Sequence, residues 1–144
     1  MDLNLIQLKI IDPDCYPTRN HAGDAGYDLR LSRDITVYPG YAERVGVGVC
    51  FGLPEGICGF VSHRSSLAFK HGCVCSYGVI DSSYTGEVQV LIFNHGRTQA
   101  TFKKGDRVAQ IVFAPVLYTK LEPVDSLVMG KAGFGSSGGY KNGK

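Results

Sequence analysis

The stretch Val45-Gly46-Val47-Gly48-Val49-Cys50-Phe51 decides the fold class, because larger apolar residues alternate along it with smaller ones. Successive side chains of a β-strand point to opposite faces, so a period of two predicts a strand with one face in a core. Residues 3–10 repeat this period more roughly. The segment Val88–Phe93 is almost continuously apolar, which predicts a strand that is buried on both faces.

Turn-forming residues separate these strands at nearly regular intervals, at Pro39-Gly40, Pro54-Glu55-Gly56, Asn94-His95-Gly96 and Lys104-Gly105-Asp106. Only Ser65–Lys70 has a helix-like composition, and 19 glycines among 144 residues disfavour long helices. Short strands joined by turns predict an all-β sandwich or barrel that carries one short helix.

Length and charge exclude several classes of protein. A chain of 144 residues fits one domain, and 15 Lys and Arg against 13 Asp and Glu give a net charge of +2. This balance is unlike that of a protein that wraps duplex nucleic acid. The longest nearly apolar stretch, Ile111–Tyr118, is shorter than the ~20 residues of a membrane helix, and residues 1–10 have no signal-peptide pattern. We therefore expect no nucleic-acid partner and no membrane association.

Cysteine and histidine residues show no metal-binding spacing. The five cysteines are an odd set without a Cys-x-x-Cys pair, which predicts small, reduced core residues in an intracellular, reducing compartment: Cys15, Cys50, Cys58, Cys73 and Cys75. The four histidines are expected at surface or turn positions without a carboxylate partner: His21, His63, His71 and His95.

The C-terminal residues 129–144 differ from residues 1–128. From Gly130 onward the chain has six glycines, three lysines and no acidic residue, so it buries too little apolar area to offset its ordering entropy. We predict a barrel domain over 1–128 and a flexible C-terminal arm over 129–144, with Phe134 as a stacking lid. Gly133–Gly138 fits G-x-G-x-x-G, but without a strand before it and a helix after it this is no dinucleotide site.

Four further motifs carry groups suited to nucleotide chemistry, and each has a plainer explanation. Gly78–Gly86 places Asp81 at a strand end and Tyr84 on a turn, which is also typical of an Asx-turn with a half-buried Tyr. Arg64–Ser66 precede the short helix and suit a phosphate, or Ser65 is an ordinary N-cap. Ala25–Leu29 and Gly105–Gln110 also read as plain turns that lead into strands.

Taken together and in this order, the five motifs resemble those of the trimeric dUTPase family, which read roughly AGxDL, PRSGL, GxIDxxY, GDRxAQ and RGxGGFGSTG. The resemblance extends from about Ala25 to Gly138. It implies a distorted jelly-roll β-barrel that assembles as a homotrimer with shared active sites. It also implies that the chain hydrolyses dUTP to dUMP and pyrophosphate with Mg²⁺ as cofactor.

The same resemblance assigns roles to individual residues. Asp81 matches the general base that activates the attacking water, and Asp28 matches the acid that holds a metal-bound water. The ring of Tyr84 is expected to lie against deoxyribose, and the hairpin from about Cys73 to Asp81 to read uracil through main-chain groups. The substrate-binding residues implied in this way are Arg64, Ser65, Ser66, Gly78, Val79, Tyr84, Gln110, Lys131, Phe134, Gly135, Ser136 and Ser137.

Some positions depart from the family pattern and keep alternatives open. Met129 stands where the family carries an Arg five places before Phe134, so we expect weaker γ-phosphate binding, and whether Lys131 replaces that Arg stays open. A catalytically weakened interaction module is therefore one alternative. A dCTP deaminase is another, because Arg64–Ala68 reads RSSLA. However, Leu91 stands where such deaminases carry a catalytic Glu.

Overall fold

The computed structural model describes residues 5–127. In chain order its elements are β1 (Gln7–Ile10), the 3₁₀ helix η1 (Pro13–Cys15), β2 (Gly26–Arg30), β3 (Ile35–Val37), β4 (Ala42–Gly52), β5 (Ile57–His63), α1 (Ser65–His71), β6 (Cys73–Cys75), β7 (Gly78–Ile80), β8 (Glu87–Asn94), β9 (Ala100–Phe102) and β10 (Arg107–Pro115).

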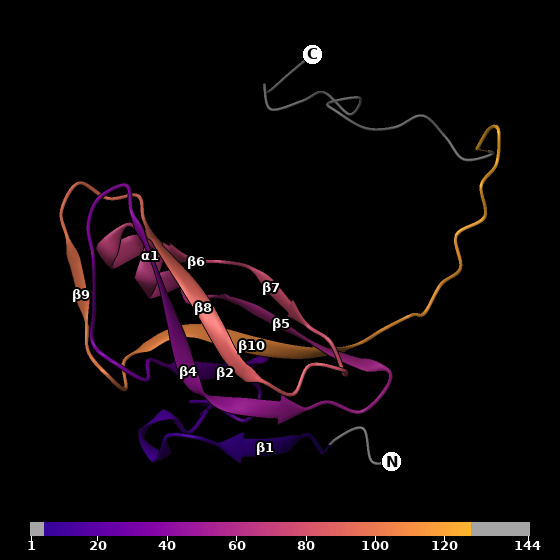
Figure 1. Cartoon of the computed structure of the whole chain (residues 1–144), viewed down its shortest axis with the longest axis horizontal. Helices are drawn as coiled ribbons and strands as arrows, with labels where there is room; N and C mark the ends of the chain where they lie inside the picture. Colours follow the sequence, from indigo (N-terminus) through magenta and orange to yellow (C-terminus); the bar gives the residue numbers. More distant parts are fainter. Residues whose placement is uncertain (1–4, 128–144) are drawn as a thin grey trace.

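The strands form two four-stranded sheets and one small ribbon, and all of their pairings are antiparallel. The sheet orders are β1-β4-β8-β6 and β2-β10-β5-β7, and β3 pairs with β9. Figure 1 shows the long strands β4 and β8 side by side, with α1 at one end of the molecule. This arrangement confirms the predicted all-β jelly-roll barrel with one short helix.

The core lies between the sheets and is built from strand residues that recur with a period of two. β4 and β8 are neighbours in one sheet, and their buried side chains belong to one cluster: Val45, Val47 and Val49 from β4, and Val88, Val90 and Ile92 from β8. Burial of each such side chain stabilises the fold by about 1.5–3 kcal/mol relative to exposure.

The regular alternation of β4 is interrupted at Gly48. Gly48 has a φ of +66°, and the pairing of β4 with β8 shifts register between Gly46 and Cys50. The carbonyl oxygen of Gly48 accepts hydrogen bonds from the backbone N–H groups of Ile11 and Asp12, at 2.8 and 3.1 Å. A bulge of this kind needs a residue that adopts the left-handed conformation freely, as glycine does.

The prediction that Val88–Phe93 is buried on both faces is wrong for one face of β8. Val88, Val90 and Ile92 are buried, whereas Leu91 and Phe93 are half-buried and Gln89 is exposed. The reason is that the outer face of this sheet is left uncovered by the rest of the chain that the structure describes.

Two predictions about residue classes can be checked in residues 5–127. All five cysteines are free and buried, and burial raises the pKa of Cys75 to about 12, which keeps this thiol protonated and unreactive. Their predicted role as small core residues is confirmed. In the same part of the chain, no helix is both long and apolar enough to cross a bilayer.

The short helix α1 begins at Ser65, the residue that was predicted to cap it. Arg64 is the N-cap with extended backbone and no side-chain capping bond, so the expectation of Ser65 as an ordinary N-cap is wrong. Leu67 anchors α1 in the core, and Gly72, with a φ of +64°, ends it by donating to the carbonyl oxygens of Ala68 and Leu67. Beyond β10, residues 116–127 run away from both sheets (Figure 1).

Candidate functional site

A polar pocket of about 300 Å³ opens on the outer face of the sheet β2-β10-β5-β7. It brings together four residues that the sequence motifs predicted, namely Asp28, Arg64, Ser65 and Gln110. Asn20, Asp24, Ala25 and Gly26 complete its lining. Three motifs that are far apart in the sequence therefore meet at one surface.

The register of the sheet explains why these side chains meet. Asp28 of β2 lies opposite Gln110 of β10, which in turn lies opposite Ser62 of β5, so the three occupy one row across the sheet. Arg64 and Ser65 follow β5 directly. Gly26 stands two residues before Asp28 on the same face, and a Cβ there would lie 2.7 Å from Gln110 Oε1. The absence of a side chain at Gly26 therefore leaves room for the Gln110 amide.

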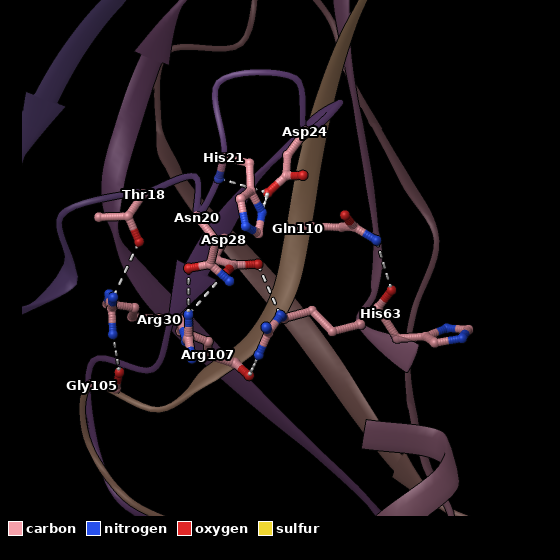
Figure 2. A network of polar contacts seen from close by, with 11 residues as sticks. Thr18, Asn20, His21, Asp24, Asp28, Arg30, His63, Gly105, Arg107 and Gln110 are labelled. Carbon is pink, nitrogen blue, oxygen red and sulfur yellow. Dashed lines mark hydrogen bonds and ion pairs between the residues drawn. The ribbon is translucent and has the colours of Figure 1, made fainter. Parts of the chain in front are cut away.

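The carboxylate of Asp28 is the centre of an ionic network in this pocket. Its Oδ1 accepts from Arg64 Nε at 2.8 Å, and its Oδ2 lies 3.4 Å from Arg107 Nη1. Arg107 Nη1 also donates to Asn20 Oδ1 at 3.0 Å, and Arg64 Nη1 donates to the Arg107 carbonyl at 3.2 Å. Figure 2 shows Asn20, Asp28 and Arg107 converging at this point. Arg64 thus brings a guanidinium group to the pocket lining, and such groups form charge-assisted hydrogen bonds with phosphate oxygens.

The loop before β2 forms the rim of the pocket. Asp28 donates its backbone N–H to the Thr18 carbonyl at 2.7 Å, and Arg30 Nη2 donates to Thr18 Oγ1 at 3.1 Å. At the tip of this loop, His21 donates its backbone N–H to Asp24 Oδ2, and its ring Nδ1 lies 3.4 Å from the same oxygen (Figure 2). The expectation that no histidine has a carboxylate partner is therefore wrong for His21.

A second group of predicted residues lies on the segment that follows β7. The backbone N–H of Tyr84 donates to the Asp81 carbonyl at 3.0 Å, which closes the turn through main-chain atoms and not through an Asx side chain. Tyr84 Oη donates to the Glu87 carbonyl at 2.6 Å, and this hydroxyl lies against Gly86. Asp81 is exposed, and none of the hydrogen bonds and ion pairs found in residues 5–127 engages its carboxylate. Its carboxylate is thus available to a ligand.

The β6–β7 hairpin opens between the two sheets. β6 pairs with β8 and β7 pairs with β5, so the two arms belong to different sheets. Gly78 faces the same side of β7 as Ile80, yet a Cβ on Gly78 would meet no atom within 4 Å. β7 is also an edge strand, so half of its backbone N–H and C=O groups have no strand partner. We call the open space beside Gly78, together with the free edge of β7, the hairpin slot.

The pocket and Asp81 lie at opposite ends of β5. Ile80 is opposite Gly59, and the antiparallel pairing carries Asp81 toward the start of β5, whereas Arg64 follows its end. Five residues of extended chain separate Gly59 from Arg64, which corresponds to about 16 Å. Within one protomer, the residues expected to bind phosphates and those expected to carry the chemistry are therefore apart.

Comparison with known proteins identifies the family. The sequence profile of the dUTPase family matches residues 13–138. The chain belongs to the dUTPase family. It is 40% identical over 142 residues to the deoxyuridine 5'-triphosphate nucleotidohydrolase of Rhodococcus erythropolis, covering 94% of this chain and 87% of that protein. The same enzyme of Saccharomyces cerevisiae is 41% identical over 126 residues, with coverages of 85% and 86%.

Solved structures agree with this assignment to the dUTPase family. The dUTPase of Staphylococcus bacteriophage 80alpha, solved with dUPNHPP, superposes with a TM-score of 0.87 and is 27% identical. The match covers 94% of this chain and 99% of that chain. The family predicted from the five motifs is thus confirmed.

Some residues of the dUTPase motifs lie elsewhere or were missed. Ser66 is half-buried in the first turn of α1 and is not part of the pocket lining. Asn20, Asp24 and Arg107 were not predicted, although Asp24 precedes the first motif and Arg107 lies inside the fourth. The predicted arm residues lie outside the described residues: Met129, Lys131, Phe134, Gly135, Ser136 and Ser137.

Proposed function

We infer that this chain hydrolyses dUTP to dUMP and pyrophosphate, as the names of its dUTPase relatives indicate for those proteins. The observation that carries this inference is the exposed carboxylate of Asp81, which has no hydrogen-bond or ion-pair partner within residues 5–127 and stands just after the edge strand β7, beside the hairpin slot. An exposed acid without a protein partner is placed to accept a proton from water.

In the proposed reaction Asp81 orients a water molecule and takes its proton as the oxygen attacks the α-phosphorus. The bond to the bridging oxygen breaks, and pyrophosphate leaves on the side opposite the water. Tyr84 is held by its hydrogen bond to the Glu87 carbonyl, so its ring forms a fixed wall against deoxyribose. A ribose 2′-hydroxyl has no room at such a wall.

The substrate contacts follow from the two groups of residues. The main chain of Gly78 and Val79 is proposed to read the uracil edge, because uracil offers an N3–H donor between two carbonyl acceptors. Arg64, Ser65, Ser66 and Gln110 are proposed to bind the phosphates, in or next to the polar pocket. From the arm, we assign Lys131, Ser136 and Ser137 to the γ-phosphate side, with Phe134 and Gly135 over the base.

The donor atoms of the pocket fit a magnesium ion that enters with the triphosphate. Carboxylates of Asp24 and Asp28 and amide oxygens of Asn20 and Gln110 line it, and Mg²⁺ prefers oxygen ligands. Within residues 5–127 no three His, Cys, Asp or Glu side chains form a metal cluster, so these residues supply no closed cage. When bound, Mg²⁺ neutralises charge on the phosphates. Asp28 is the residue we assign to its bound water.

A homotrimer with shared sites is the assembly we propose. The distance between Asp81 and the polar pocket supports it, because a neighbouring copy has to bring the two groups together. Residues 116–127 support it as well, since Leu117, Leu121 and Leu127 are almost fully exposed in the part of the chain that the structure describes. The free, buried cysteines support a reducing compartment as the place of action.

The test is pyrophosphate release from dUTP, measured beside dCTP and UTP, for the full chain and for Asp81→Asn. We expect release from dUTP alone and a loss of about 10²–10⁴-fold in kcat in Asp81→Asn, the range of general-base catalysis. Glu55→Gln serves as the matched control, since Glu55 is an exposed turn residue outside the pocket lining and outside the five motifs. Release of ammonia from dCTP would instead show that the chain is a deaminase. The absence of any reaction with dUTP, dCTP and UTP would show that it is an interaction module.

A further inference from the structure

Two aromatic side chains beside the hairpin slot have no part in the proposed reaction. Phe60 of β5 and Tyr77, which directly precedes β7, stack with ring centroids 6.0 Å apart and planes inclined by 24°. Tyr77 is nevertheless 66% exposed, so its ring does little to fill the core. The stack therefore holds Tyr77, which connects β6 to β7, in a defined orientation against β5.

Ser76 and Tyr77 are neighbours in the sequence but are attached to different sheets. Ser76 donates its backbone N–H to the Leu91 carbonyl at 2.8 Å, and its Oγ accepts from the Leu91 N–H at 3.3 Å. Both bonds hold Ser76 on β8. Tyr77 is held on β5 by Phe60, which itself lies opposite Val79 of β7. The peptide between residues 76 and 77 therefore crosses from one sheet to the other with both of its ends fixed.

The hairpin slot begins at this crossing. The space for a Cβ at Gly78 is open, and the distance of β7 from β6 sets the room that a base would have beside it. Uracil and thymine differ by one methyl group on C5. A pocket separates ligands that differ by one such group by only about 10–200-fold, and only when its wall does not yield. The attachment that fixes β7 therefore decides how well the slot rejects the methyl group.

We propose that Phe60 and Tyr77 form a specificity-determining support that holds β7 at a fixed distance from β6 and thereby excludes the 5-methyl group of thymine nucleotides. The inference rests on the proposed function, because it takes the hairpin slot as the place of the base. Neither side chain touches the reacting atoms, so both are positioning residues. Their loss changes base discrimination and KM and leaves kcat for dUTP in place.

The experiment measures kcat and KM for dUTP and dTTP in the wild-type chain, Tyr77→Ala, Phe60→Leu and the double variant. We expect the ratio of the two kcat/KM values to fall by about threefold to tenfold in each single variant, the range that an aromatic pair is worth. The double variant should fall no further than the larger single effect, because both changes remove one contact. Tyr77→Phe keeps the ring and should keep the ratio.

Tyr38→Ala is the matched control, because Tyr38 is a similarly exposed tyrosine in the turn before β4. It should keep the discrimination ratio. Variants of Tyr77 and Phe60 that are folded and assembled like the wild type, yet keep the ratio, overturn the proposal. If the wild type releases no pyrophosphate from dUTP, the proposed function fails. In that case the affinities of the same variants for dUMP and dTMP, measured by calorimetry, test the inference separately. A preference for dUMP that falls in Tyr77→Ala and Phe60→Leu supports it, and an unchanged preference overturns it.

Discussion

Arg64 Nε lies 2.8 Å from Asp28 Oδ1, which joins the residue that precedes α1 to the middle of β2. The salt bridge is largely shielded from solvent, with side-chain exposures of 23% and 12%. A charge-assisted hydrogen bond in such a place fixes the plane of the guanidinium group. The Arg64 side chain is therefore oriented before any phosphate reaches the pocket, which gives Asp28 a positioning role in addition to the metal-bound water proposed for it.

Asp28→Asn should raise KM for dUTP by about tenfold to a hundredfold, because removal of a charged partner weakens a buried hydrogen bond by about 1.5–3 kcal/mol and leaves Arg64 free to turn. Steady-state kinetics at saturating Mg²⁺ measure it. Asp34→Asn removes an exposed partner of Lys103 and serves as the control. A shift in the Mg²⁺ midpoint with KM unchanged would contradict the positioning role and leave Asp28 with the metal-bound water alone.

Gly26→Ala should weaken substrate binding with little loss of stability. A Cβ at Gly26 would lie 2.7 Å from Gln110 Oε1, and this atom ends a flexible side chain that is able to move away. The displaced amide then loses its hydrogen bond to the His63 carbonyl and its place in the pocket. We expect KM for dUTP to rise several-fold, about 1 kcal/mol of binding free energy.

The control for this variant is Gly23→Ala in the same region of the chain, where an added Cβ meets no atom within 4 Å. It should leave KM unchanged. Equal effects of the two variants would show that the Gln110 amide does not bind substrate. Thermal unfolding of both proteins checks that neither change acts through the fold.

Local features of the fold were predictable from the sequence because each depends on a few adjacent residues. The turn at Lys104-Gly105-Asp106 is present, with Gly105 at a φ of +85°, and Ser65–Lys70 is helical as expected. The bulge at Gly48 was not predicted, since the period of two continues through it in the sequence. Its cause is the contact with Ile11 and Asp12, which belong to a distant segment.

Likewise, the local features of the candidate site were predictable from the sequence, and its long-range contacts were not. Asp81 and Tyr84 share one turn, so their motif was legible in the sequence. The contact of Asp28 with Arg107 was not, because it joins residues 79 apart through the pairing of β2 with β10. A bulge between Arg107 and Ala109 shifts that register and brings Arg107 toward Asp28. Irregular pairing of this kind leaves no periodic signal in the sequence.

Gly48→Ala should destabilise the fold strongly, because Gly48 lies with a positive φ at the bulge of β4. The positive φ alone costs about 1–3 kcal/mol for a residue with a Cβ. The new Cβ would also lie 2.7 Å from Cys15 Cβ, which is buried and has no room to withdraw. Urea unfolding measures the free energy difference. Gly40→Ala, with a φ of +81° and no atom within 4 Å of the Cβ, isolates the strain and should cost less.

Stability at acid pH should depend on the ion pair of Asp12 with Lys104. The hydrogen bond from Lys104, and then that from the backbone N–H of Asp14, lower the pKa of Asp12 below its ordinary 3.8. A carboxyl group with a lowered folded-state pKa stabilises the fold above its unfolded-state pKa. That contribution is lost as pH falls from about 4 through the lower folded-state value.

The Lys104→Met variant should bring the pKa of Asp12 back toward its ordinary value and flatten this loss. A carboxyl NMR titration of Asp12 and urea midpoints between pH 2 and pH 6 measure the two effects. Lys9→Met removes an exposed lysine from β1 and should leave both as they are in the wild type. The expectation fails if Asp12 titrates identically with and without Lys104, because its lowered pKa is attributed first to that ammonium group.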